Sequence, residues 1–132
     1  MPRQLRVDDF MTTALITMKP SDTLEHADVD MRLAAIRHIP VVDDHGRLVG
    51  ILSNRDVLRA LAQNGGPGGV RIGAIMTQRV RTCTPRTTAA QAAQTMMEHK
   101  IGSLPVIGEE GELVGLITES DFVRLVGEGY ES

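Results

Sequence analysis

The apolar positions in the first half of the chain change their spacing from one stretch to the next. Residues 15–18 form a short apolar stretch that ends before Pro20, and this predicts a strand. Apolar residues then recur every three or four positions, which predicts a helix; they are Leu24, Ala27, Met31 and Ala34. The sequence Asp22-x-x-Glu25 resembles a capping box, so we expect the helix to begin there.

Two more short apolar runs follow this helix, at residues 40–42 and 48–52. The turn-forming residues Asp43-Asp44-His45-Gly46 separate them, and this arrangement predicts a β-hairpin. A second helix is predicted over residues 54–63, with an apolar face formed by Val57, Leu58 and Leu61. The unit therefore has the expected order β-α-β-β-α.

The same order of elements occurs twice in the chain. Sliding the sequence along itself lays residues 7–61 over residues 72–126 without an insertion. Met11-Thr12 then matches Met76-Thr77, and the apolar run at 46–53 matches 111–118. The second copy has its own predicted strand at 80–83, capping box at Thr88-x-x-Gln91 and turn at 108–111. Its final helix is predicted at 119–126, with an apolar face formed by Phe122, Val123 and Val126.

A glycine-dense run, residues 64–69, separates the two copies. This composition favours a flexible, exposed connection, and the run lacks the Lys-Ser/Thr ending of a phosphate-binding P-loop. We therefore divide the chain into a first repeat (1–63), a linker (64–70) and a second repeat (71–132). A lone unit would leave one sheet face exposed, whereas two copies can pack those faces together. The expected fold class is α+β, with pseudo-twofold symmetry between the two repeats through their sheets.

Composition and charge narrow the range of functions. Fourteen basic residues stand against seventeen acidic ones, and the basic ones are scattered, so no surface for DNA or an anionic membrane is indicated. With no Trp, one Tyr and two Phe, an aromatic platform for single-stranded nucleic acid is also disfavoured. We find no signal segment and no membrane-spanning run.

The residues that could bind a metal or take part in catalysis do not form a metal site or a catalytic motif. The single Cys83 excludes an intrachain disulfide, suits a reducing cytoplasm and is expected to be a buried small hydrophobe. The histidines form no i, i+4 pair on one helix and have no neighbouring Cys, so no metal is predicted. No nucleophile elbow or metalloprotease pattern is present, and we expect the protein not to be an enzyme.

The sequence Ser53-Asn54-Arg55-Asp56, repeated as Thr118-Glu119-Ser120-Asp121, stands where each apolar strand gives way to a helix. Amides at a helix N-terminus attract anions, so a hydroxyl and a carboxylate beside them could hold a phosphate and a sugar diol. An ordinary N-cap accounts for the same residue types. The local sequence leaves both interpretations open.

Taken together, these features resemble a tandem pair of cystathionine-beta-synthase (CBS) domains over essentially all of residues 7–126. The resemblance rests on Met-Thr before the first strand, on Ile-Pro-Val-Val-Asp and Leu-Pro-Val-Ile, and on the two blocks Gly-Ile-Leu-Ser-Asn-Arg-Asp and Gly-Leu-Ile-Thr-Glu-Ser-Asp. It implies a stand-alone module that binds adenosine-type nucleotides, such as AMP, ADP, ATP or a related adenosyl ligand, in clefts between the repeats. It implies no catalytic cofactor.

The resemblance also assigns residues to this ligand. Asp56 with Ser53, and Asp121 with Thr118, would hold ribose and phosphate. The other expected ligand-binding positions are Thr17 and Thr82 on the first strands, Ile39, Pro40, Leu104 and Pro105 at the adenine, and Arg55 and Ser120 beside the aspartates. Because Arg55 can fork onto a phosphate while the second motif has Glu119-Ser120, we expect the Asp56 site to suit a phosphate chain better.

The resulting functional prediction is a cytoplasmic regulatory sensor. The resemblance implies a homodimer, and we expect any regulated protein to be a separate chain. A ligand-free scaffold for dimerisation or protein docking is the alternative.

Overall fold

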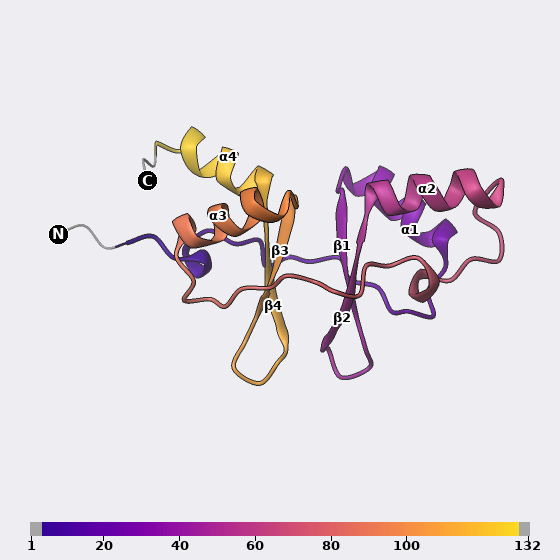
Figure 1. Ribbon diagram of the computed structural model, residues 1–132, viewed down its shortest axis with the longest axis horizontal. Coiled ribbons are helices and arrows are strands. Elements are labelled where there is room, and N and C mark those ends of the chain that lie inside the picture. The colour runs from indigo at the N-terminus through magenta and orange to yellow at the C-terminus, as the bar shows by residue number, and fades with distance from the viewer. Residues whose placement is uncertain (1–3, 130–132) are drawn as a thin grey trace. The chain divides into compact units, whose positions relative to one another are not determined.

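The structure, a computed structural model, describes residues 4–129 and divides into two compact units (Figure 1). The first unit is Ile16–Val80, and the second unit combines the chain up to Leu15 with the chain from Arg81 onward. This division differs from the sequence repeats, because the segment before Leu15 packs with the helices and strands of the second repeat. The outer ends of the predicted repeats, 1–3 and 130–132, lie outside the described residues.

Each unit contains an antiparallel hairpin and two α-helices, which confirms the α+β class (Figure 1). The first unit comprises α1 (Leu24–Ala34), β1 (His38–Val42), β2 (Leu48–Ser53), α2 (Asn54–Asn64) and the 3₁₀ turn η2 (Ile72–Ala74). The second comprises the 3₁₀ turn η1 (Val7–Asp9), α3 (Ala89–His99), β3 (Ser103–Ile107), β4 (Leu113–Thr118) and α4 (Glu119–Gly127).

The first predicted strand of each repeat is reduced to one parallel bridge. Met18 pairs with Val41, and its amide donates to the Pro40 carbonyl at 3.1 Å while its carbonyl accepts from the Val42 amide at 2.8 Å. Cys83 pairs with Val106 in the same way. Each segment therefore runs along the edge of a hairpin without extending the sheet into a third full strand.

The helix starts are set by side-chain caps. Thr88 and Gln91 exchange hydrogen bonds of 3.1 and 3.0 Å between side chain and backbone, so the predicted capping box of α3 is confirmed. The prediction for α1 was wrong by one residue. Thr23 is the N-cap and accepts from the His26 amide, whereas the Asp22 carboxylate accepts from the Lys19 amide in the preceding turn.

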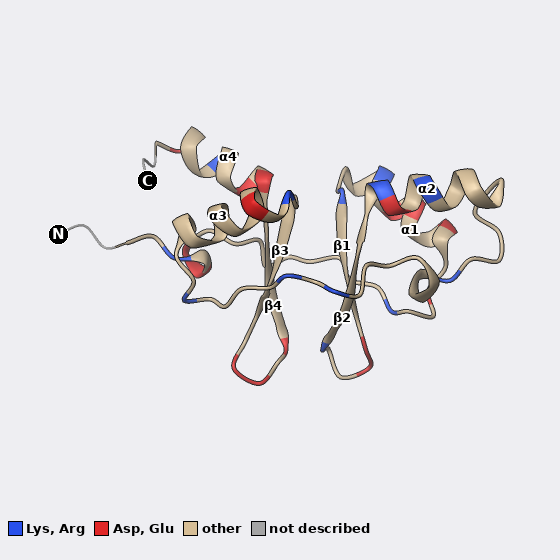
Figure 2. Ribbon diagram, viewed as in Figure 1, with Lys and Arg blue, Asp and Glu red and all other residues tan. Residues whose placement is uncertain are grey.

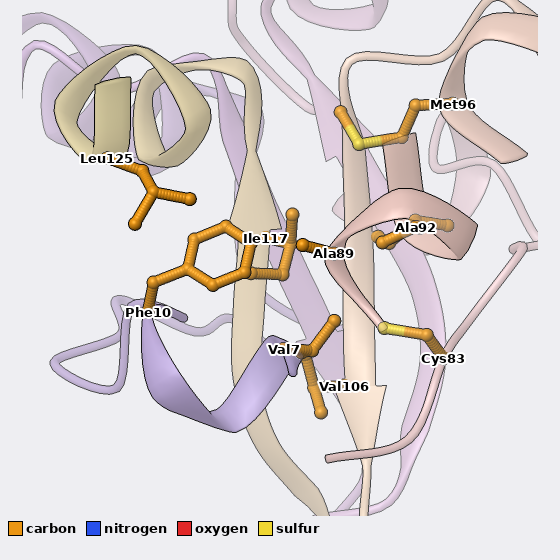
Figure 3. Close-up of a cluster of buried hydrophobic side chains, with 10 residues drawn as sticks. Val7, Phe10, Cys83, Ala89, Ala92, Met96, Val106, Ile117 and Leu125 are labelled. Atoms are coloured by element: carbon orange, nitrogen blue, oxygen red, sulfur yellow. The ribbon is translucent and has the colours of Figure 1, made fainter. Parts of the chain in front are cut away.

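Each unit has its own aliphatic core. In the second unit, Phe10 lies beside Leu125 and Ile117, and Cys83 packs with Val7 and Val106 (Figure 3). Burial raises the pKa of the Cys83 thiol to about 11. Cys83 is thus the small buried hydrophobe that the sequence predicted.

The final helices bury only some of the residues expected, with Val57 buried and Leu61 and Phe122 packed against the cores. In α2, Val57 and Ala60 are buried, whereas Leu58 is 57% exposed. In α4, Leu125 is buried, whereas Val123 and Val126 are about 70% exposed (72% and 69%). The predicted apolar faces were therefore wrong at Leu58, Val123 and Val126, because apolar type alone does not say which side of a short helix faces the core.

The glycine-rich linker begins as a helix cap. Gly65 adopts a left-handed conformation (φ 71°) and its amide donates to the Leu61 carbonyl, which ends α2. The Asn64 side chain then donates to the Gly66 and Gly68 carbonyls at 2.7 and 2.9 Å. The chain returns to the core of the first unit at Ile72, which is fully buried.

Candidate functional site

The corner between β2 and α2 carries the first predicted motif. The Ser53 hydroxyl oxygen accepts from the Asp56 amide at 3.1 Å, and the Ser53 amide donates to Asp56 Oδ2 at 3.0 Å. This reciprocal pair satisfies two of the free amides at the start of α2. Both residues are half-buried, and Arg55 is exposed beside them.

The hairpin register brings other predicted residues toward this corner. Ser53 lies opposite His38, so Ile39 and Pro40 follow directly across the hairpin. Thr17 precedes Met18, whose amide bonds to the Pro40 carbonyl. Thr17 is exposed, whereas Ile39 is fully buried in the aliphatic core and Pro40 is buried as well. The Ile39 side chain is therefore occupied by the core.

The second unit repeats this layout. Ser103 lies opposite Thr118, and Leu104 lies opposite Ile117. The amide of Cys83, the residue after Thr82, donates to the Pro105 carbonyl at 3.0 Å. Leu104 and Pro105 are buried, whereas Thr82 and Ser120 are exposed.

The carboxylates of the two corners differ sharply in how they are engaged. Asp121 is 1% exposed, and its carboxylate has four polar contacts. Oδ2 accepts from the Thr118 amide at 2.8 Å and from the Thr118 hydroxyl at 3.3 Å. Oδ1 accepts from the Thr12 hydroxyl at 2.7 Å and lies 3.2 Å from Arg124 Nη2. A carboxylate offers about four acceptor positions, so that of Asp121 is saturated.

Asp56, by contrast, receives one side-chain hydrogen bond in the structure, from the Ser53 amide to Oδ2. Its Oδ1 atom has no hydrogen-bond partner among the described residues. Because Asp56 is also half-buried instead of buried, its carboxylate has acceptor positions open to another molecule.

The charges around the two corners also differ (Figure 2). The first turn of α2 carries Arg55 together with Asp56, and Arg59 follows one turn later. The first turn of α4 carries two acids, Glu119 and Asp121, and Arg124 is engaged with Asp121. The more cationic corner is thus the one whose carboxylate is less occupied.

Thr12 is the residue that sequence reasoning did not assign to a site. It appeared only as part of the repeated Met-Thr pair. Its contact with Asp121 joins positions at opposite ends of the chain. No local pattern indicates such a contact, and Thr77, its counterpart in the repeat, would have been an equal candidate.

Within residues 4–129, no three His, Cys, Asp or Glu side chains gather closely enough to hold a metal ion. None of the helices in this described part has the length and apolar character needed to cross a membrane.

Comparison with known proteins gives consistent results. The CBS domain model matches residues 7–63 and again 72–128. The chain is 35% identical over 121 residues to homoserine O-acetyltransferase of Methanococcoides burtonii, covering 92% of this chain and 24% of that protein. The chain therefore spans about a quarter of the length of this curated relative, an enzyme.

Solved structures match this chain over nearly its whole length. The CBS domain pair of protein MJ0100, in complex with 5'-methylthioadenosine and S-adenosyl-L-methionine, has a TM-score of 0.86 and 31% identity, covering 97% of this chain and 100% of that one. CBSX2, in complex with AMP, has a TM-score of 0.82 and 28% identity, covering 94% and 97%. Because the CBS domain model matches the chain twice and a solved CBS domain pair has the same fold, this chain belongs to the CBS domain family, as a tandem pair.

Proposed function

We propose that this CBS pair is a non-catalytic regulatory module that binds an adenosine-type nucleotide at the corner of β2 and α2. The observation that carries the proposal is the Asp56 carboxylate, which is half-buried, held by the Ser53 amide through Oδ2 and without a partner at Oδ1. The two hydroxyls of a ribose can both donate hydrogen bonds to one carboxylate.

The surroundings of Asp56 support a phosphate next to the sugar. Arg55 is exposed on the first turn of α2, and its guanidinium carries donors in a fork that fits phosphate oxygens. The amide end of α2 adds partial positive charge on the same side. The adenosyl ligands of the two structural neighbours support the same ligand class for this chain.

A regulatory role requires that the ligand prefer one of two states of the protein. We propose that this readout involves a homodimer in the cytoplasm and a separate regulated protein. The exposed apolar side chains of the helices support a dimer: Leu33, Leu58, Met97, Val123 and Val126 are between 57% and 83% exposed. The same side chains favour the alternative, a scaffold that docks proteins without any nucleotide.

A thermal-shift panel with AMP, ADP, ATP, S-adenosylmethionine and NAD separates the two functions. A ligand at about 100 times its dissociation constant adds about 2.7 kcal/mol to the free energy of unfolding. A shift with one of these ligands supports the sensor, and no shift with any of them favours the scaffold. Turnover of the nucleotide by purified protein would contradict a non-catalytic role.

Calorimetry on a matched pair of variants then tests at which corner the nucleotide binds. Asp56→Asn keeps an oxygen for the Ser53 amide but removes the charge and one acceptor, so we expect it to lose most of the binding. Asp121→Asn is the control and should bind as the unmodified protein does. Loss of binding in Asp121→Asn with retention in Asp56→Asn would place the ligand at the other corner.

A further inference from the structure

The segment at residues 10–12 in the second unit is fastened to α4 by three side-chain contacts. The Thr12 hydroxyl donates to Asp121 Oδ1 at 2.7 Å, and Arg124 Nη2 donates to the Phe10 carbonyl at 2.7 Å. The Phe10 and Phe122 rings meet edge to face with centroids 5.2 Å apart. Figure 3 shows the Phe10 ring lying toward Leu125 of α4.

The backbone of the corresponding segment in the first unit is paired in the same way. Thr12 exchanges two 2.9 Å backbone hydrogen bonds with Leu116, and Thr77 exchanges two of 2.9 Å with Ile51. Yet the structure has no hydrogen bond between the Thr77 side chain and Asp56, and Thr77 is exposed. The backbone alone therefore does not produce the Thr12 contact.

The sequence differences between the copies account for the additional fastening. Ile75 and Val57 stand where the second unit has Phe10 and Phe122, so the aromatic contact has no equivalent. Arg59 stands where the second unit has Arg124, but the structure gives it no bond to the Ile75 carbonyl. The fastening is specific to the second unit.

We infer that Thr12 is a specificity-determining residue, whose hydroxyl occupies the Asp121 carboxylate in place of a ligand hydroxyl and so restricts nucleotide binding to the Asp56 corner. The inference rests on the proposed function. A hydroxyl at 2.7 Å from Oδ1 uses the acceptor that a ribose hydroxyl would need. With the Thr118 amide, the Thr118 hydroxyl and Arg124 at the remaining positions, a ligand must first displace an internal donor.

The cost of that displacement reduces affinity at the Asp121 corner. The loss of a hydrogen bond to a charged group changes a binding constant about tenfold or more. Removal of the Thr12 hydroxyl should therefore raise the affinity of this corner for AMP by about tenfold.

The test uses calorimetric titration of AMP into full-length variants that lack the Asp56 carboxylate. Asp56→Asn alone is the reference, and Asp56→Asn with Thr12→Ala should bind AMP about tenfold more tightly. Asp56→Asn with Thr12→Ser retains the hydroxyl and should match the reference. The mirror control, Asp121→Asn with Thr77→Ala, should bind no more tightly than Asp121→Asn, because Thr77 does not occupy Asp56.

The outcomes separate this inference from the proposed function. If the unmodified protein binds AMP through Asp56 but Thr12→Ala brings no gain over the reference, the inference is wrong and the proposed function stands. If only the Thr12→Ala variants bind, the inference stands and the assignment to Asp56 is wrong. If neither the unmodified protein nor any variant binds AMP or another ligand of the thermal-shift panel, both are wrong. Should the Thr12→Ala variants unfold, Thr12→Val in the Asp56→Asn background should give the same gain, because it removes the hydroxyl from Asp121 but keeps a side chain of about the same size.

Discussion

Gly50 of β2 lies so close to Met76 that a β-carbon at this position would stand 2.7 Å from the Met76 sulfur. The same β-carbon would be 2.9 Å from the Thr77 carbonyl oxygen. Gly115 of β4 has the same relationship with Met11 and Thr12 in the other unit. The repeated glycine in the Leu-Val-Gly block is thus explained by the Met-Thr segment that lies across each hairpin.

The first prediction concerns this contact. Gly50→Ala forces the Thr77 backbone away from β2, and overpacking of this kind costs typically about 1–3 kcal/mol in the free energy of unfolding. Urea denaturation measures the change. Gly68→Ala is the control, because a β-carbon there meets nothing within 4 Å, and it should leave stability nearly unchanged. Equal stability of Gly50→Ala and the unmodified protein would show that the segment is not held at this distance.

A second prediction tests the capping of α3. Thr88→Ala removes the oxygen that accepts from the Gln91 amide, and loss of such a cap costs about 1 kcal/mol in the free energy of unfolding. Thr95→Ala, within the same helix, removes only a hydroxyl bonded to the Gln91 carbonyl and should cost less. A larger loss at Thr95 than at Thr88 in urea denaturation would contradict the assigned helix start.

A third prediction follows from the buried thiol. Burial raises the pKa of Cys83 from 9.0 to about 11, so the unfolded chain releases this proton first as the pH rises. The stabilisation is fully present below pH 9 and is lost as the pH rises through about 11. We therefore expect the free energy of unfolding to fall more steeply between these pH values in the unmodified protein than in Cys83→Ala. Identical slopes for the two proteins would contradict the burial of the thiol.

The elements of the fold were predictable because their signals are local. The hairpin at residues 38–53 and the helix after it follow from apolar spacing and from turn residues such as Gly46, whose φ is 76°. The start of α1 was misplaced because Asp22 and Thr23 are both residue types that cap helices. Thr23 is the cap, since the Asp22 carboxylate accepts from the Lys19 amide instead.

The partner of each Met-Thr segment could not be predicted. Met11-Thr12 and Met76-Thr77 are identical, and each pairs with the hairpin of the other sequence repeat, Thr12 with Leu116 and Thr77 with Ile51. Which hairpin a short extended segment joins depends on the path of the whole chain. The sequence favoured the Asp56 corner only through the charge of Arg55. It could not predict that Thr12 occupies the Asp121 carboxylate, because that contact depends on the pairing of Thr12 with Leu116.

The last prediction concerns the phosphate specificity of the Asp56 corner. Arg55 is exposed on the first turn of α2, where it can reach a phosphate without contributing to the core. Arg55→Ala should therefore weaken ATP binding about tenfold, the worth of one charge-assisted hydrogen-bonded pair, while adenosine binding changes little. Raising the salt concentration should shrink this difference, because interactions of an exposed charge are screened.

Calorimetric titration of ATP and of adenosine into the unmodified protein and Arg55→Ala gives the change in affinity for each ligand. Arg47→Ala is the matched control, since Arg47 is also exposed but lies at the turn end of the hairpin, at the opposite end of β2 from Ser53. An equal loss for ATP and adenosine in Arg55→Ala would show that the arginine acts on the fold of the corner instead of on the phosphates. A loss of ATP binding in Arg47→Ala as large as that in Arg55→Ala would show a general effect of charge, because removing either arginine changes the net charge of the chain equally.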